Sequence, residues 1–293
     1  MAQIINGKIL AKKIKKQVIN ELKQLGNQHT CSNRRPNLAI ILIGERQDSM
    51  LYVELKEKEA KKFGIDMHTY KCPEDISERE ILEIINHLNQ DDLIDGILVQ
   101  LPLPKGFDTD AIIRAIDPAK DVDRFHPDNL KILFSTCNHH SVIPPVFAVV
   151  LEMLKSINYD MQGKQVCIIC NWDIFGKGLT RVMECQGCKA DIANADDKNL
   201  NKKTRQADIL ISAVGKPGFI KKEMIKRDCV IIDIGIVKKG KKVYGDVDFK
   251  DCQDKAKYIS PVPGGVGPLT IAMAFKNTLE LYKRNNKNNK IKK

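Results

Sequence analysis

Apolar and polar residues alternate along the first half of the chain in a way that predicts helices and strands in turn. Apolar side chains recur every three or four positions over residues 9–25, which indicates an amphipathic helix. A short apolar run at 38–43 predicts a buried strand, and the helix that follows would end at Gly64. The capping-box pattern Ser-x-x-Glu opens a further helix at 77–88, and another buried strand is predicted at 94–100.

The second half of the chain repeats this alternation. A helix is predicted after Gly176, and helices that follow Pro145 and Pro268 would connect the two halves. Strands are predicted at 164–170, 190–193, 209–214 and 230–234. Strands that alternate with helices form parallel sheets, so we expect an α/β protein of two domains with a cleft between them. The second domain would be a Rossmann-like doubly wound parallel sheet.

Domain boundaries follow from the connecting helices. The first domain would comprise residues 1–143 and 269–293, and the second residues 144–268. Ligands of such sheets lie beyond the carboxyl ends of the strands. This rule selects the segments that directly follow the predicted strands, namely Gln100, 170–176, 214–218 and 233–236.

Composition and charge exclude several classes of protein. With 43% hydrophobic residues and no apolar run of about 18 residues, the chain is predicted to be globular, without a membrane span. The net charge of +11 includes six positive residues in an Asn-rich tail after residue 282, which we expect to be disordered. No nucleic-acid motif accompanies these charges. The N-terminus lacks a signal-peptide pattern, so we expect a cytoplasmic protein whose nine cysteines are reduced.

The segment Ser49–Lys56 carries the first candidate chemistry. Tyr52 and Lys56 stand four residues apart and are neighbours on a helix, and Ser49 suits the helix N-cap. A lysine whose pKa is lowered by its surroundings can exchange protons near neutral pH. Lysines on a charged helix face are usually only solvated, so this segment alone does not define a site.

Three further motifs change that picture. The run Asp95–Pro104 ends a buried strand in Gln100, the run Lys120–Asp123 places two carboxylates in a loop, and Pro261–Pro268 is a proline- and glycine-rich loop that leads into a helix. In this order, and with Ser-x-x-Tyr-x-x-x-Lys, they resemble the bifunctional methylenetetrahydrofolate dehydrogenase/cyclohydrolase family. The resemblance covers residues 4–282.

The resemblance implies interconversion of methylene-, methenyl- and formyl-tetrahydrofolate in one-carbon metabolism and purine biosynthesis by a homodimer. Lys56 would be the acid/base group of the hydrolytic step. Gln100 would orient it and favour its neutral form, and Tyr52 would stack on the folate and help order the site. Asp123 would bind the pterin ring. The folate site would also be walled by a loop that contains Pro263, Gly264, Gly265 and Val266. No metal is implied.

The predicted coenzyme turn departs from the family pattern Gly-Arg-Ser-x-Ile-Val-Gly-x-Pro. Here the turn begins Cys170-Asn171-Trp172 and ends in Gly178, while Gly176 is retained. Other departures are Arg124 for a glycine, Asn194 for a histidine, and Ile143-Pro144-Pro145-Val146-Phe147 for Cys-Thr-Pro-x-Gly.

Coenzyme would therefore bind through backbone groups at Cys170, Asn171 and Trp172, and through Gly176, Gly235 and Ile236. The resemblance implies NADP. NAD is an alternative, because Asp196 and Asp197 follow the second strand of this half, where a carboxylate favours a free ribose hydroxyl.

Three other interpretations stay open. The altered turn is compatible with a cyclohydrolase that has lost hydride transfer, or with a folate-binding protein without activity. The spacing Cys167-x-x-Cys170 and Cys185-x-x-Cys188 resembles a zinc site, although strand alternation would send the first two thiols to opposite faces.

Overall fold

The computed structural model describes residues 1–27, 34–137 and 143–291, with side chains as far as residue 285. The chain divides into two compact units. Unit 1 comprises Met1–Ala11, Ile132–His139 and Val146–Thr270, and unit 2 comprises Lys12–Lys131, His140–Pro145 and Ile271–Lys293. This division differs from the predicted domain boundaries at the N-terminus, because the first strand pairs within unit 1.

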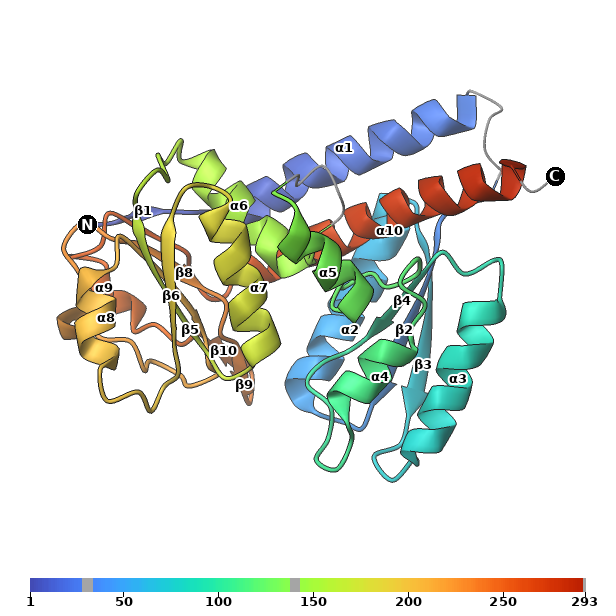
Figure 1. The fold of residues 1–293 in the computed structure, drawn as a ribbon, viewed down its shortest axis with the longest axis horizontal. Helices are drawn as coiled ribbons and strands as arrows, with labels where there is room; N and C mark the ends of the chain where they lie inside the picture. Colours follow the sequence, from blue (N-terminus) through green and yellow to red (C-terminus); the bar gives the residue numbers. More distant parts are fainter. Residues whose placement is uncertain (28–33, 138–142, 292–293) are drawn as a thin grey trace. The chain divides into compact units, whose positions relative to one another are not determined.

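Unit 1 is built on a six-stranded sheet in which all neighbouring strands are parallel (Figure 1). In spatial order the strands are β1 (Gln3–Ile4), β11 (Tyr258–Ile259), β8 (Val230–Asp233), β7 (Ile209–Ala213), β5 (Gln165–Cys170) and β6 (Lys189–Ala193). The helices of this part are α6 (Pro145–Ser156), α7 (Asp173–Glu184), α8 (Leu200–Gln206), α9 (Phe249–Cys252) and the 3₁₀ turn η1 (Lys222–Met224). A hairpin of β9 (Val237–Lys239) and β10 (Lys242–Tyr244) follows β8.

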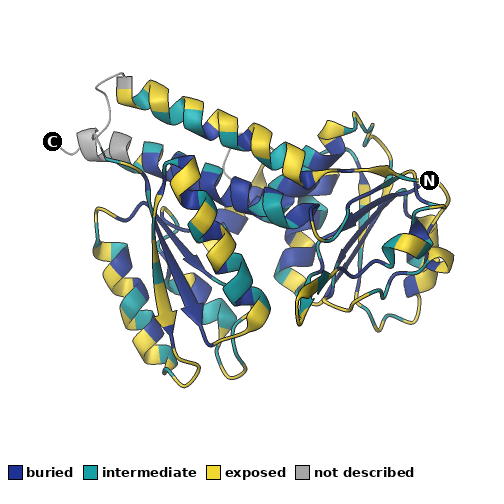
Figure 2. Ribbon diagram, turned by 180° about the vertical axis from the view of Figure 1, so that it is seen from behind, coloured by how far each residue is buried: buried dark blue, intermediate teal, exposed yellow. Residues whose placement is uncertain are grey.

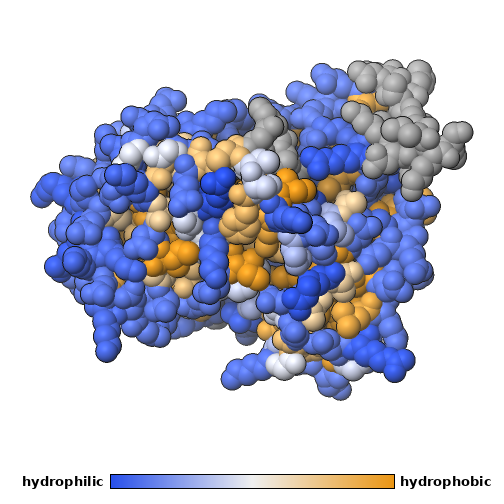
Figure 3. Space-filling view, in the orientation of Figure 1, coloured by the Kyte–Doolittle hydropathy of each residue, from blue (hydrophilic) through white to orange (hydrophobic). Residues whose placement is uncertain are grey.

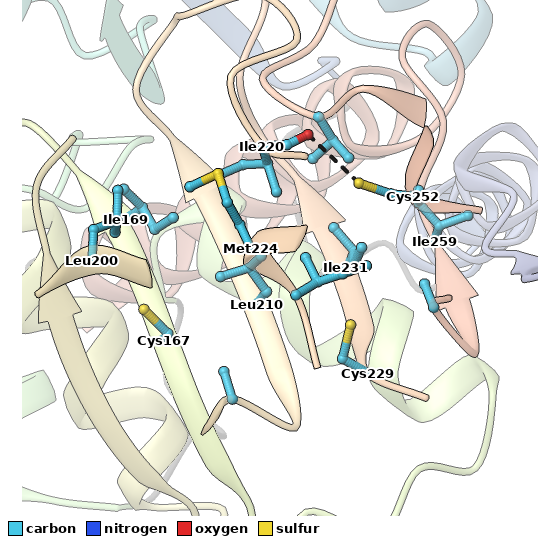
Figure 4. Packing of buried hydrophobic residues seen from close by; sticks show 14 of the residues in the cluster. Cys167, Ile169, Leu200, Leu210, Ile220, Met224, Cys229, Ile231, Cys252 and Ile259 are labelled. Atoms are coloured by element: carbon cyan, nitrogen blue, oxygen red, sulfur yellow. Dashed lines mark hydrogen bonds between the residues drawn. The ribbon is translucent and has the colours of Figure 1, made fainter. Parts of the chain in front are cut away.

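The central strands β5, β7 and β8 are almost entirely buried, as their continuous apolar runs predict (Figure 2). On one face of the sheet, Cys167, Leu210 and Ile231 pack with residues of α8 and α9 (Figure 4). Within the same cluster the Cys252 thiol donates a hydrogen bond to the Ile220 carbonyl, at 3.5 Å. The thiol therefore contributes to the core as a small apolar group with one weak polar contact.

The strand order of unit 1 defines where a ligand can bind. The chain passes from β5 to its neighbour β6 on one side, and then crosses back over β5 to β7 on the other side. The order of the strands therefore reverses at β5. The loops after β5 and β7 therefore lie at a topological switch point, where ligands of doubly wound sheets usually bind. This arrangement confirms the predicted doubly wound sheet.

Unit 2 contains a three-stranded parallel sheet in the order β3 (Asp66–Cys72), β2 (Asn37–Ile43), β4 (Gly96–Val99). Its helices are α2 (Gln47–Phe63), α3 (Glu78–Gln90) and α4 (Thr109–Ala115), while α1 (Gly7–Asn27), α5 (Pro127–Ser135) and α10 (Val266–Ile291) contain residues of both units. The apolar core between this sheet and α3 includes Ile41, Ile85, Ile97 and Ile112.

The predicted helices and strands are found with shifted ends, but nine further α-helices and strands among the described residues were not predicted: β1, β3, β9, β10, β11, α4, α5, α8 and α9. The capping box of α3 is confirmed, since the Ser77 hydroxyl accepts from the Glu80 amide and the Glu80 carboxylate accepts from the Ser77 amide. Strand β3 was not predicted, because its residues are mostly polar and it has no continuous apolar run. The expectation of a disordered tail is wrong as far as Ile291, since α10 continues to that residue.

The expectation that every cysteine is reduced is also wrong. Cys137 and Cys185 form a disulfide, which joins the segment after α5 to the C-terminal end of α7. Cys167 lies in the core cluster, whereas the Cys170 thiol faces α7, as the alternation of a strand requires. Cys185 is disulfide-bonded to Cys137, so the candidate zinc ligands Cys167, Cys170, Cys185 and Cys188 do not form one site.

No helix in the described part of the chain is long and apolar enough to cross a membrane. Hydrophilic side chains cover most of the face drawn in Figure 3, with apolar side chains in smaller groups between them. Among the described residues, no group of three or more His, Cys, Asp or Glu side chains could hold a metal ion.

Reduction of the disulfide is expected to destabilise the protein by about 2–4 kcal/mol, because the bond closes a long loop in the unfolded chain. Urea denaturation with and without dithiothreitol measures this loss. The variant Cys137→Ser should match the reduced protein and should not respond to reductant. A wild-type protein that shows nine reactive thiols without reductant, and no response to it, would contradict the pairing.

Candidate active site

Helix α2 presents one continuous buried face, and that face includes a lysine. The buried residues recur every three or four positions: Ser49, Val53, Lys56, Ala60 and Phe63. Val53, Ala60 and Phe63 make the apolar stripe that anchors the helix against the rest of unit 2. Lys56 lies within this stripe and is only 6% exposed, so its amine is held inside the fold and does not extend into solvent.

The Lys56 amine has a fixed hydrogen-bond partner at the end of β4. Its Nζ donates to Oε1 of Gln100 at 2.8 Å, and Nε2 of Gln100 donates to the Leu101 carbonyl at 2.8 Å. The Gln100 backbone amide donates to the Ile41 carbonyl at 2.9 Å. Because Nε2 is used locally, the amide oxygen must face the lysine, and Gln100 fixes the direction of the amine.

Burial shifts the pKa values of three groups around this amine. It lowers the pKa of Lys56 to about 8, and the charge of Asp123 partly opposes this shift. It raises the pKa of Asp123 to about 6, against the opposing charge of Lys56. The pKa of Tyr52 is also raised, by burial and by Asp48, so its phenol stays protonated. Near neutral pH the site therefore combines an amine that can release a proton, a carboxylate and a neutral hydroxyl.

The two carboxylates of the Lys120–Asp123 run have different roles. Asp121 forms a parallel bridge to Ile97, which brings the following residues alongside the end of β4. The Asp121 carboxylate accepts hydrogen bonds from the backbone amides of Arg124 and His126 and from the side chain of Asn129, so it holds the turn. Asp123 is left as the carboxylate whose charge acts on Lys56.

Arg124 preserves this turn although it is not a glycine. Its φ of 60° lies in the left-handed region, which explains why glycine is typical of this position in the family pattern. The side chain is buried and donates to the Pro118 carbonyl at 2.8 Å. The arginine thus adopts the backbone conformation that glycine takes most easily.

Ser49 does not cap α2, contrary to expectation. The helix begins at Gln47, so Ser49 lies inside its first turn, where it is 3% exposed. Its hydroxyl is buried and has no hydrogen-bond partner among the described residues. A buried hydroxyl without a partner is uncommon, and this one lies one turn before Tyr52 on the same helix.

In unit 1, the turn between β5 and α7 lies at the carboxyl end of β5, at the switch point of the sheet. Trp172 is the N-cap residue of α7, and the Asn171 side chain donates to the Val214 carbonyl, at 3.2 Å. A Cβ placed on Gly176 would lie 2.8 Å from the Cys170 sulfur. The Cys170 side chain therefore points toward α7.

The loop after β7 is held by a buried carboxylate. Asp246 accepts from the Ser212 hydroxyl and from the backbone amides of Val214 and Lys216, each at 2.8 Å. A Cβ on Gly235 would lie 2.1 Å from the Asp246 side chain, so only glycine fits there. The neighbouring Asp233 is also buried, and burial and the charge of Asp246 raise its pKa to about 7.

The glycine-rich loop that contains Pro263 and Val266 also belongs to unit 1. Gly264 has a φ of 110°, which a side chain would strain, and its carbonyl accepts from the Lys8 amide at 3.2 Å. Gly265 contacts the backbone of Gly7 so closely that a Cβ on Gly7 would overlap its carbonyl oxygen. The loop is thus tightly shaped by its own backbone. Its role as a wall of the folate site stays a prediction.

Two family models match the chain almost from end to end. The catalytic domain of tetrahydrofolate dehydrogenase/cyclohydrolase matches residues 5–123, and the NAD(P)-binding domain of the same enzymes matches residues 144–286. The chain belongs to the tetrahydrofolate dehydrogenase/cyclohydrolase family. The resemblance seen in the motifs is therefore confirmed, and most of unit 1 corresponds to the domain that binds NAD or NADP in this family.

Curated relatives match this chain over nearly their full length. The bifunctional protein FolD of a Nitratiruptor species is 42% identical over 282 residues, which are 96% of this chain and 98% of that protein. The bifunctional protein FolD of Aquifex aeolicus is 41% identical over 97% of this chain and 96% of that protein.

Solved structures show the same fold. The bifunctional FolD dehydrogenase/cyclohydrolase of Campylobacter jejuni superimposes with a TM-score of 0.88 at 36% identity, over 97% of this chain and 99% of the other. The Trypanosoma brucei enzyme in complex with NADP and an inhibitor gives a TM-score of 0.89 at 32% identity, over 97% and 98% of the two chains.

The altered coenzyme turn keeps its place at the carboxyl end of β5. Cys170 adds a side chain where the family pattern has glycine, but that side chain is buried and faces Gly176 of α7. The backbone amides at the start of α7 remain at the carboxyl ends of β5 and β7, where such turns bind a pyrophosphate. The residues present would hold the coenzyme by backbone groups, which depend little on side-chain identity.

Removal of the Asp246 carboxylate should destabilise unit 1 strongly. The variant Asp246→Ala leaves one hydroxyl and two backbone amides without partners, at a cost of about 3 kcal/mol or more in the free energy of unfolding. Urea denaturation measures the loss, and Asp196→Ala is the matched control, since that side chain is 92% exposed and should change stability by less than about 0.5 kcal/mol. Equal effects of the two substitutions would contradict the role of Asp246.

Proposed function

We propose that this chain carries out both reactions of its family, with hydrolysis dependent on Lys56 and hydride transfer dependent on the turn after β5. The substrate would be a folate whose methylene carbon bridges two nitrogens. Loss of a hydride from this carbon gives a methenyl cation, water adds to the cation, and the adduct opens to the formyl derivative. The buried contact between Lys56 and Gln100, at 2.8 Å, is the observation that carries this proposal.

Lys56 would move the proton of the hydrolytic step. With a pKa of about 8, a substantial fraction of the amine is neutral near pH 7.5 and can accept a proton from the attacking water. The same group can return the proton to the departing nitrogen when the ring opens. Gln100 would keep the amine directed at the bridge, because its own orientation is fixed by the Leu101 carbonyl.

The neighbouring side chains would bind the folate. Asp123 lies close enough for its charge to act on Lys56, and its carboxylate would accept hydrogen bonds from the pterin ring. Tyr52, one turn before Lys56, would stack on the substrate, and the Ser49 hydroxyl would gain the partner it lacks among the described residues. The loop of Pro263, Gly264, Gly265 and Val266 would contribute a further wall.

NADP would be the hydride acceptor, bound in unit 1. The Trypanosoma brucei relative was solved with NADP, which supports this choice. Backbone groups at Cys170, Asn171 and Trp172 would contact the coenzyme, together with Gly176 and the segment of Gly235 and Ile236. NAD is the alternative, because Asp196 lies after β6 and Asn171 replaces an arginine.

The family resemblance also carries three proposals about cellular context. The enzyme would act as a homodimer, it would operate in the cytoplasm, and it would supply one-carbon units for purine biosynthesis. None of these depends on the geometry of the site.

A cyclohydrolase without hydride transfer is the second candidate function. It is motivated by the Asn171-Trp172 sequence, which places a large aromatic residue at the N-cap of α7. A paired assay distinguishes the two: reduction of NADP and NAD with methylenetetrahydrofolate, beside hydrolysis of methenyltetrahydrofolate. Both reactions at comparable rates support the main proposal, and hydrolysis alone supports the second.

The variant Lys56→Met should lose hydrolysis by at least about 100-fold, because it removes the proton-transfer group but keeps an apolar chain in the buried stripe. Hydrolysis of methenyltetrahydrofolate measures the loss. Lys58→Met is the matched control on the same helix, since Lys58 is exposed. Hydrolysis that is unchanged in Lys56→Met would refute the assignment.

The pH dependence of hydrolysis should follow the Lys56 amine. Its pKa is lowered to about 8 in the ligand-free protein, so kcat/KM is expected to rise as the pH increases through about 8 and the amine becomes neutral. Because the charge of Asp123 raises the pKa of Lys56, Asp123→Asn should move this rise to lower pH. A rise that stays in place or moves upward would show that the two groups are not coupled.

A further inference from the structure

Helix α7, which follows the coenzyme turn, is contacted by large groups on opposite sides at two glycines. A Cβ on Gly176 would lie 2.8 Å from the Cys170 sulfur, and a Cβ on Gly178 would lie 2.8 Å from Cε2 of Phe147. Two residues along an α-helix correspond to a rotation of about 200°, so these contacts fall on nearly opposite faces. The helix is therefore held between the thiol of β5 and the phenyl ring of α6.

The ring of Phe147 makes a second contact with the same helix. It meets the ring of Phe175 edge-on, with the centroids 5.4 Å apart, and it is fully buried. Buried aromatic pairs of this geometry are stabilised beyond the area they bury. Phe147 thus contacts both the first turn of α7 and its backbone at Gly178.

The absence of a side chain at Gly178 is required by this packing. Glycine inside a helix is less favourable than alanine, so its presence there needs a reason. The reason is the Phe147 ring, which occupies the space that any side chain at Gly178 would need. In the family pattern, a small glycine aligns with Phe147 and a larger proline aligns with Gly178. In this chain the larger residue lies at position 147 and the smaller one at position 178.

We propose that Phe147 is a positioning residue for the coenzyme site: by its contact with Gly178 and Phe175 it sets the place of α7, and thereby the conformation of the Cys170–Gly176 turn. The proposal rests on the function proposed above, in which this turn binds the coenzyme. Phe147 has no exposed surface, so it cannot itself contact the coenzyme. Small displacements of such a turn have large effects, because the backbone groups that bind the ligand move with it.

A double-mutant cycle tests this coupling. The variant Gly178→Ala forces the helix away from the ring and should raise the dissociation constant of the coenzyme about tenfold or more. The variant Phe147→Leu removes the atoms that would clash, so Phe147→Leu with Gly178→Ala should return the constant to within about threefold of the wild type. Quenching of Trp172, the single tryptophan of the chain, reports NADP and NAD binding without turnover.

Two controls separate positioning from general loss of structure. Hydrolysis of methenyltetrahydrofolate should be unchanged in all three variants, because Lys56 lies in unit 2. Gly26→Ala places a methyl group on a helical glycine with open space around it and should leave coenzyme binding unchanged. If the wild type binds coenzyme but the two substitutions change the dissociation constant independently, so that their effects multiply, the positioning role would be overturned. A wild type that binds neither coenzyme would instead overturn the proposed dehydrogenase function on which the role rests.

Discussion

The burial of one amine on the packed face of α2 is the constraint on which the proposed chemistry of this protein depends. A charged lysine in an apolar stripe is unfavourable in free energy. The hydrogen bond to the oriented Gln100 amide compensates part of this cost. Burial, and not the amide, lowers the pKa of Lys56, while Asp123 keeps that pKa from falling further. The two opposing effects leave the amine close to the pH at which it can both take up and release a proton. The same helix supplies Tyr52 and Ser49 one and two turns earlier, so a single helix carries most of the candidate site.

The two halves of the chain differ in how they keep their function. In unit 2 the motif side chains are retained, and even Arg124 adopts the conformation of the glycine that it replaces. In unit 1 several motif residues have changed, and the structure accommodates them by packing. The thiol of Cys170 is buried against Gly176, and the ring of Phe147 occupies the space above Gly178. The coenzyme site depends on strand order and backbone groups, which tolerate such exchanges better than a side-chain catalyst would.

The sequence predicted most of the fold because buried parallel strands are continuous apolar runs, and these are easily recognised. It missed β3, whose residues are polar and only partly buried. It also took Ser49 for a helix cap, because a cap and a buried hydroxyl in the first turn look alike without the helix start. The separate roles of Asp121 and Asp123 could not be read from their spacing, since they depend on the bridge to β4. Nor could the pairing of Cys137 with Cys185, which depends on two segments that lie far apart in the sequence.

The most direct test of the central claim is a titration of the Lys56 amine itself. Carbon-13 label at the lysine ε positions, with Lys56→Met to assign the signal, gives the pKa by NMR in the ligand-free protein. A value of about 8 is expected, because the amine is buried beside one carboxylate. A value near the ordinary 10.5 would show that the amine is solvated, and the assignment of Lys56 as the proton-transfer group would be wrong.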